Sequence, residues 1–141
     1  MGANSRLTVG VHVLTWMSLA HRHGRDVVTS DQVAASVNTN AVVIRRTLGR
    51  LRDAGLVDVQ RGQGAGWRLA RAPKDITLLE VYQAVEEDAL FALHHGTPNQ
   101  ECPVGRGIQP VLRHVYDGVE DSVRGELAKT SIADVLAETV A

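Results

Sequence analysis

Residues 37–62 read VNTNAVVIRRTLGRLRDAGLVDVQRG, and this segment indicates the fold most directly. Its apolar side chains first recur at helical spacing, which predicts a helix from about Ala41 to Ala54. Gly55 follows where a glycine commonly ends a helix. The segment Leu56–Gln60 then alternates apolar and polar residues, which predicts a strand. The hydrophobic period therefore changes from 3.6 to 2 within a few residues.

Upstream of this helix the sequence predicts two more helices. Thr29–Asp31 offers capping side chains for a short second helix, whose apolar side holds Val33 and Val37. Asn38–Asn40 forms a tight polar turn, because asparagine tolerates left-handed backbone geometry. The first helix is expected over about Ser5–Ala20.

Downstream, Trp67–Ala70 alternates again and predicts a second strand, separated from the first by the glycine-rich loop Arg61–Gly66. A phosphate-binding loop is the other interpretation of these glycines. The Lys-Ser/Thr pair of a P-loop is missing, however, and a strand follows where a dinucleotide site needs a helix. Three helices followed by a hairpin give the order of a winged helix-turn-helix, so the expected fold is mainly α with a small β-hairpin wing.

The amino-terminal run has two interpretations. Arg6 followed by the apolar stretch 7–20 is superficially similar to a secretory signal, with small residues at its end. The same residues also recur near helical spacing, and polar side chains such as His12 interrupt them, which favours a buried helix. The run is too short to span a bilayer, so we expect no membrane segment and a cytoplasmic protein.

The second half begins at a natural boundary, Ala72–Asp75, which predicts a winged domain over residues 1–72 and a helical dimerisation or sensor region over 73–141. A helix is expected over about Thr77–Glu87, and Phe91–Gly105 is expected to be an irregular loop. The longest periodic segment runs from about Gly107 to Lys129, with Pro110 placed in its first turn. A short terminal helix, capped by the residues around Ser131, ends the chain.

Charge divides the chain in the same place. The chain carries a net charge of −1 in total, yet residues 1–72 hold ten arginines against four acidic residues, a balance of +6, and the remainder balances to −7. A basic front half indicates a polyanionic partner. The one cysteine excludes an internal disulfide and a four-cysteine zinc site.

The helix over 41–54 has the two sides that a DNA-recognition helix needs, an apolar stripe (Ile44, Leu48 and Leu51) and a cationic face. Residues near its start are predicted to contact base edges: Thr39, Asn40, Val42, Val43 and Arg46. One of the two valines suits a thymine methyl group. The predicted phosphate contacts are Arg45, Arg50, Arg61 and, as a weaker candidate, Arg68. Arginines that only solvate a surface helix are the alternative, which the regional charge and the wing disfavour.

The helix over 107–129 carries an apolar stripe from Ile108 to Leu127, whose members are nearly all four residues apart. A chain this short has little left to cover about 30 Å of helix, so a second copy is the expected cover. Gly118 and Gly125 each cost about 1 kcal/mol inside a helix, which fits a close approach of two backbones.

Several motifs in order resemble the Rrf2 family of bacterial transcription regulators. They are Val37–Arg46, Leu51–Val57, Arg61–Ala70, Asp75–Val81, Cys102–Ile108 and Leu127–Asp134, and together they cover nearly the whole chain. The resemblance implies a homodimer joined through the long helix, with two winged domains on double-stranded DNA at a pseudo-palindromic operator. It implies repression more often than activation.

Many members of that family hold an iron–sulfur cluster through three cysteines before the long helix, and this chain has only Cys102. An all-cysteine [2Fe–2S] cluster needs four thiolates, so no cluster or other metal is expected, even with His94 and His95 nearby. Cys102 is instead a candidate redox sensor, because a helix start favours the thiolate form. Glu101 opposes this, and a lone cysteine is commonly a small buried side chain. A small ligand is a third possible signal, although no sequence pattern shows a pocket for it.

The predicted function is therefore a homodimeric, sequence-specific transcription regulator. The alternative is a protein-interaction module whose basic face binds an acidic partner. Salt-dependent binding to a preferred duplex sequence separates the two. No nucleophile–base–acid arrangement or metal quartet is evident, so we do not expect an enzyme.

Overall fold

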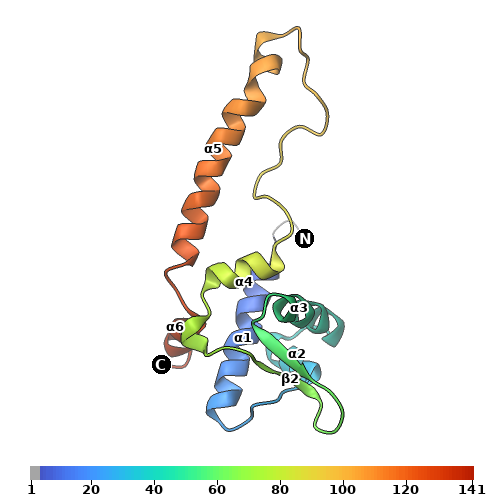
Figure 1. Ribbon diagram of the computed structural model, residues 1–141, viewed down its shortest axis with the longest axis vertical. Helices are drawn as coiled ribbons and strands as arrows, with labels where there is room; N and C mark the ends of the chain where they lie inside the picture. The colour runs from blue at the N-terminus through green and yellow to red at the C-terminus, as the bar shows by residue number, and fades with distance from the viewer. Residues whose placement is uncertain (1–3) are drawn as a thin grey trace. The chain divides into compact units, whose positions relative to one another are not determined.

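The computed structural model describes residues 4–141, which form two compact units. The first unit holds residues 4–86 together with 127–141, and the second holds residues 87–126. The chain is mainly helical with a two-stranded antiparallel hairpin, so the predicted fold class is confirmed (Figure 1).

Helix α1 (Arg6–Arg22) lies at the centre of the first unit, and α2, α3, α4 and α6 all pack against it. Val13 and Leu14 are fully buried, and Met17 and Ala20 are nearly so. The apolar run that is similar to a secretory signal therefore supplies the core of the folded unit. No helix within residues 4–141 is long and apolar enough to cross a membrane.

Helices α2 (Ser30–Val37) and α3 (Ala41–Asp53) form the helix-turn-helix. Thr29 caps α2 in a reciprocal capping box with Gln32. Asn38 ends α2 in the left-handed conformation at φ 63°, as its residue type predicts. Asn40 then begins α3, because its side-chain oxygen accepts a hydrogen bond from the Val43 N–H at 3.0 Å.

The wing is the hairpin of β1 (Val57–Gln60) and β2 (Gly66–Leu69), with Val57 opposite Leu69 and Val59 opposite Trp67. Val28 extends this sheet on the other side through two backbone hydrogen bonds with Trp67, of 2.7 and 2.9 Å. A Cβ atom on Gly66 would lie 2.5 Å from the Val28 carbonyl oxygen. Glycine is therefore required there for the wing to join the body of the unit.

The 3-10 turn η1 (Pro73–Asp75), helix α4 (Leu78–Val85) and helix α6 (Ile132–Thr139) complete the first unit. The starts of α4 and α6 are tied together, because the Leu78 N–H donates to the Thr130 carbonyl and the Ile132 N–H donates to the Ile76 carbonyl, each at 2.9 Å. The division expected after residue 72 therefore does not coincide with the compact units. The apolar faces of α4 and α6 pack on α1, and the two helices belong with the winged elements.

The second unit contains an irregular segment, residues 87–102, and helix α5 (Pro103–Leu127). Phe91 packs on Tyr116 with ring centroids 5.1 Å apart. The helix begins four residues earlier than the sequence predicts, with Pro103 in its first turn, so the placement of Pro110 in the first turn was wrong. Pro110 lies inside α5 and has no N–H to donate to the preceding turn.

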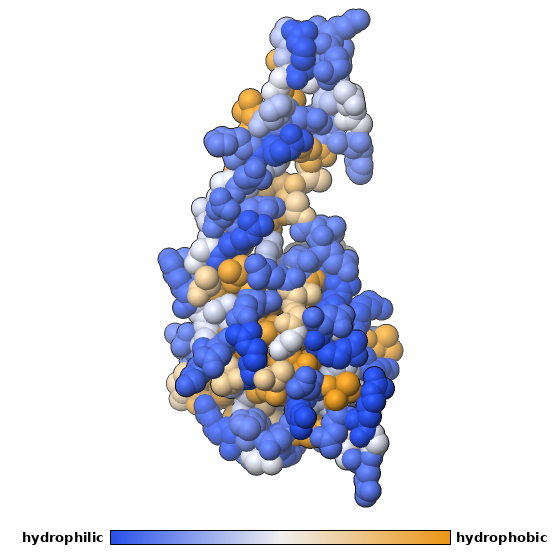
Figure 2. Space-filling model, in the orientation of Figure 1, coloured by the Kyte–Doolittle hydropathy of each residue, from blue (hydrophilic) through white to orange (hydrophobic). Residues whose placement is uncertain are grey.

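No residue of α5 is buried within this chain. Figure 2 shows apolar side chains among the hydrophilic ones on the surface of the molecule.

Candidate nucleic-acid interface

Helix α3 has one side fixed in the core and one side facing solvent. Ile44, Leu48 and Leu51 are fully buried, which anchors the helix to α1 and β1. On the outer side, Val42 is 55% exposed and Arg45 and Arg46 are exposed. The predicted stripe and the predicted cationic face are therefore both present on one rigid element.

The residues at the start of α3 divide into outward and supporting positions. Asn40 uses its side-chain oxygen as the helix cap, so only its amide N–H groups remain to donate outward. Thr39 is half-buried and its backbone N–H donates to the Ala34 carbonyl at 3.2 Å. Val43 is also half-buried, and its carbonyl accepts the Thr47 hydroxyl. Of the two valines, Val42 is therefore the one whose methyl groups face solvent.

Arg50 lies on the same helix but carries a structural contact. Its guanidinium donates to the backbone carbonyl of Val85, at the carboxyl-terminal end of α4, at 3.3 Å. The side chain is half-buried. Arg50 therefore joins α3 to α4, in addition to any phosphate contact that the sequence predicts for it.

The hairpin presents its two predicted arginines differently. Arg61 is exposed at the beginning of the loop, where Gly62 and Gly64 adopt positive φ angles of 81° and 73°. Arg68 is also exposed, but it lies directly across the hairpin from Asp58. That carboxylate reduces the positive potential at Arg68.

Trp67 and Arg52 show which face of the hairpin turns toward α3. The Arg52 guanidinium lies 6.0 Å from the centre of the Trp67 ring. Side chains alternate along a strand, so Arg68 points to the opposite face. The structure therefore does not bring Arg68 together with the α3 arginines. The sequence does not indicate this contact of Arg52, because Trp67 lies fifteen positions away along the chain.

Three outward-facing arginines have side chains that no acidic residue of the described chain neutralises. Within residues 4–141, the side chains of Arg45, Arg46 and Arg61 make neither a hydrogen bond nor an ion pair with another residue. Arg52, in contrast, is paired with Asp53 at 3.3 Å. An unneutralised guanidinium on a fixed helix can approach a phosphate or a guanine edge without breaking an internal contact.

Helix α4, whose last carbonyl accepts the hydrogen bond from Arg50, begins with an ion pair between Arg71 and Glu80 that the sequence did not predict. The Glu80 carboxylate accepts from the Arg71 guanidinium and, in the capping box of α4, from the Thr77 N–H at 3.2 Å. The hydrogen bond from Arg71 is the main cause that lowers the pKa of Glu80, and the Thr77 bonds add to it. The Thr-x-x-Glu spacing was the available signal for the cap.

Cys102 is exposed and directly precedes α5. Its backbone carbonyl accepts the Arg106 N–H at 2.8 Å and its own N–H donates to the Asn99 carbonyl at 3.3 Å, so its position is fixed by backbone contacts. Across residues 4–141, no three His, Cys, Asp or Glu side chains converge in a way that could hold a metal ion.

Comparison with known proteins agrees with this geometry. The sequence model of the Rrf2 family, described as iron-dependent transcriptional regulators, matches residues 3–138. YwnA of Bacillus subtilis, which carries the name of an HTH-type transcriptional regulator, is 40% identical over 94% of this chain and 96% of its own length. The transcriptional regulator IscR of Cereibacter sphaeroides is 28% identical over 85% of this chain and 77% of its own.

Among solved structures, a crystal structure whose name describes a DNA-binding protein is similar with a TM-score of 0.74 and 36% identity. It covers 94% of this chain and 99% of its own. These relatives bear names of regulators and DNA-binding proteins rather than of enzymes. On this evidence the chain belongs to the Rrf2 family of transcriptional regulators.

Proposed function

We propose that this regulator acts as a homodimer that binds a pseudo-palindromic operator through α3 and the wing, and that binding represses transcription. The observation that carries the proposal is α3 itself. One side of it is fixed in the core, and the other presents Val42, Arg45 and Arg46 to solvent.

The exposed chemistry of α3 suits the major groove. Arg46 has the bidentate donors that match the N7 and O6 atoms of guanine, and Val42 supplies an apolar surface for a thymine methyl group. Asn40 contributes its free amide donors, and Thr39 and Val43 support the start of the helix. Arg45 and Arg61 contact phosphates on either side, which fixes the register without reading sequence. Arg50 is a secondary phosphate contact, and Arg68 is a minor one because Asp58 opposes it.

The apolar stripe of α5 supports the homodimer. Two valines of this stripe, Val115 and Val119, are 51% and 39% exposed. A second copy of the same helix would cover this stripe through residues 107–129. Two identical winged domains then read two half-sites about one helical turn, roughly 34 Å, apart.

The signal that controls binding is a separate matter from DNA recognition. The family description names iron, but Cys102 is the one cysteine of the chain, and a dimer offers two thiolates where an all-cysteine cluster needs four. The donor set therefore does not fit such a cluster. An exposed thiol at Cys102 or a small ligand is the better candidate for relief of repression.

The experiment that tests the proposal is selection of genomic duplex fragments by the purified protein, followed by affinity measurements at several salt concentrations. An enriched inverted repeat, bound with a steep salt dependence, supports a dimeric DNA-binding regulator. If no sequence is enriched and the protein instead binds acidic polypeptides, the basic face belongs to a protein-interaction module and the proposal fails.

A further inference from the structure

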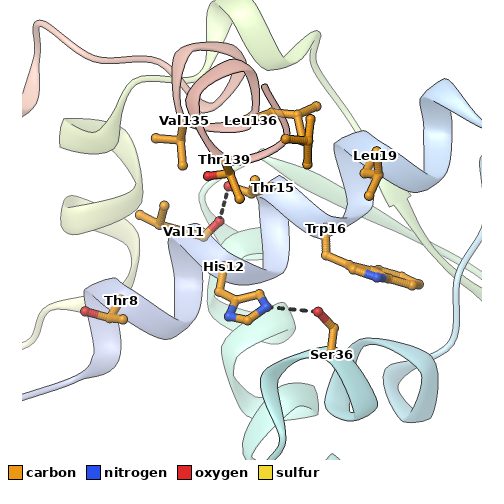
Figure 3. A pocket seen from close by; sticks show the side chains of 11 residues that line it. Thr8, Val11, His12, Thr15, Trp16, Leu19, Ser36, Val135, Leu136 and Thr139 are labelled. Atoms are coloured by element: carbon orange, nitrogen blue, oxygen red, sulfur yellow. Dashed lines mark hydrogen bonds between the residues drawn. The ribbon is translucent and has the colours of Figure 1, made fainter.

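A pocket of about 380 Å³ lies in the first unit, where α2 and α6 flank α1. Figure 3 shows its lining side chains from these three helices, with α1 crossing behind the pocket and Ser36 on α2. Most of its lining residues come from opposite ends of the chain, so no local sequence pattern indicates the pocket. We refer to it as the α1–α6 pocket.

The walls of the α1–α6 pocket are mostly apolar, and no acidic side chain, lysine or arginine is among its lining residues. The apolar lining consists of Val11, Trp16, Leu19, Val135, Leu136 and Val140. On the α2 side, the His12 Nε2 atom and the Ser36 hydroxyl are hydrogen-bonded at 2.9 Å. An apolar hollow of this size with a few convergent polar groups is the usual form of a small-molecule site.

We propose that the α1–α6 pocket binds a small uncharged molecule with a flat apolar ring system and one hydroxyl or carbonyl group. The rings lie against Trp16 and the aliphatic wall, which excludes water from them. The polar group exchanges hydrogen bonds with His12 and Ser36, each of which can both donate and accept. A cationic ligand is disfavoured, because no carboxylate of the described residues lines the pocket. The nearby Arg25 is not a lining residue, and its guanidinium lies over the Trp16 ring, 5.6 Å from the ring centre.

The position of the pocket gives the ligand an effect on DNA binding, a step that rests on the proposed function. Helix α2 leads directly into the recognition helix through the turn at Asn38. Helix α6 follows directly after α5, the proposed dimerisation helix. A ligand between α2 and α6 therefore contacts the helix that precedes the recognition helix α3 and the helix that follows α5. It stabilises the arrangement of α2 and α6 that it fits best.

The direct test follows the Trp16 indole N–H by NMR while 2-naphthol or naphthalene is titrated into the full chain. The chain has two tryptophans, so Trp67→Phe assigns the two indole signals. We expect saturable movement of the Trp16 signal with little movement of the Trp67 signal. Binding of 2-naphthol should be at least fivefold tighter than that of naphthalene, because only 2-naphthol has a hydroxyl group that can hydrogen-bond to His12 and Ser36.

Two neighbouring positions on α6 provide matched variants. Thr139 lines the pocket and Glu138 does not, and both are exposed. Thr139→Trp fills the pocket and should weaken probe binding at least tenfold, whereas Glu138→Trp should leave it within twofold. Ser36→Ala should remove the preference for 2-naphthol and leave naphthalene binding unchanged, a selectivity that general loosening of the fold would not produce.

Absence of a saturable Trp16 shift would overturn the proposal. If, in addition, Thr139→Trp raised the dimer dissociation constant, the groove would instead be a contact between two copies of the chain. The coupling is tested with the selected operator, whose affinity should change at least threefold at saturating 2-naphthol in the wild type and not in Thr139→Trp. An unchanged affinity overturns the coupling alone. Failure to select any operator overturns the proposed function, while the NMR shift is unaffected.

Discussion

Helices α1 and α5 are both long, but they obtain their stability from different sources. Seven of the 17 residues of α1 are buried by the rest of its unit, whereas none of the 25 residues of α5 is buried. The packing of α1 is complete within one chain, so its contribution to stability is independent of protein concentration. The apolar stripe of α5 gains stability only when something covers it. If that cover is a second copy, its contribution depends on concentration.

Leu14→Ala should produce the largest effect. Leu14 is fully buried at the centre of the first unit, so removing its side chain should lower the free energy of unfolding by about 2–5 kcal/mol. Urea unfolding at two protein concentrations tenfold apart measures it, and the loss should be equal at both. Val119→Ala on α5 is the comparison variant, and its loss should be larger above the dimer dissociation constant than below it. If the stability losses of Leu14→Ala and Val119→Ala depended on protein concentration in the same way, α1 and α5 would not differ in the source of their stability.

Val115→Asp should separate two protomers without unfolding either. Val115 lies on the stripe and is 51% exposed in a single chain, so an aspartate is tolerated in the monomer but would be buried in the proposed dimer. We expect the dimer dissociation constant to rise on the order of 100-fold, because a buried unpaired charge is costly. Analytical ultracentrifugation measures this change. His114→Asp places the same charge on an exposed position off the stripe and should leave the dimer intact.

Arg46→Ala should weaken operator binding by about 1–3 kcal/mol and relax the preference at one base pair. Arg61→Ala is the matched comparison, because it removes the same charge from the wing. It should weaken binding to all sequences equally and make the salt dependence shallower by about one unit of slope. Titrations with operator and with scrambled duplex at several salt concentrations distinguish them. A loss that Arg46→Ala shows equally on both duplexes would exclude a base-edge role for Arg46.

Glu80 offers a smaller, pH-dependent effect in the first unit. Its pKa is lowered in the folded protein, mainly by the hydrogen bond from Arg71, so the ion pair stabilises the fold above the ordinary carboxyl pKa of about 4.3. This stabilisation is lost as the pH falls through the lowered pKa. Glu80→Gln keeps a capping side chain but loses the charge. This substitution should lower the free energy of unfolding by about 0.5–1 kcal/mol at pH 7 and leave it unchanged below the lowered pKa of Glu80.

Glu80→Ala also removes the acceptor for the Thr77 N–H, one of the two hydrogen bonds of the α4 capping box, which should add about 1 kcal/mol that persists at every pH. Thermal unfolding of both variants between pH 3 and pH 7 separates charge from cap. A pH-independent cost for Glu80→Gln would show that Arg71 does not stabilise the carboxylate.

Local sequence patterns predicted the elements of the winged half well. The stripe Ile44–Leu48–Leu51, the turn at Asn38 and the alternation of the two strands are each set by neighbouring residues, and each is present. The contacts that position the site are different in kind. Arg50 with Val85, Arg52 with Trp67 and His12 with Ser36 join residues far apart in the sequence, so no local pattern reveals them.

The carboxyl-terminal half shows the same limit. The split expected after residue 72 followed the change in charge, but α6 belongs to the first unit because its apolar face packs on α1. The start of α5 was misplaced because the histidines, prolines and glycines of residues 91–105, Gly105 among them, indicated an irregular loop. Gly105 is instead where the helix passes close to the preceding segment, and a Cβ atom there would lie 2.2 Å from the Asn99 carbonyl oxygen. Composition alone does not distinguish a flexible glycine from a tightly packed one.

Cys102→Ser should have the smallest effect on the reduced protein and still be informative. The side chain is exposed, so the substitution should leave the melting temperature and the operator affinity of the reduced protein unchanged within error. If Cys102 senses oxidants, hydrogen peroxide should lower the operator affinity of the wild type at least tenfold, reversibly by dithiothreitol, while the serine variant keeps its affinity. Release of DNA by both proteins would place the signal outside Cys102. If peroxide releases neither protein from the operator, oxidation is not the signal, and a ligand held in the α1–α6 pocket becomes the favoured candidate.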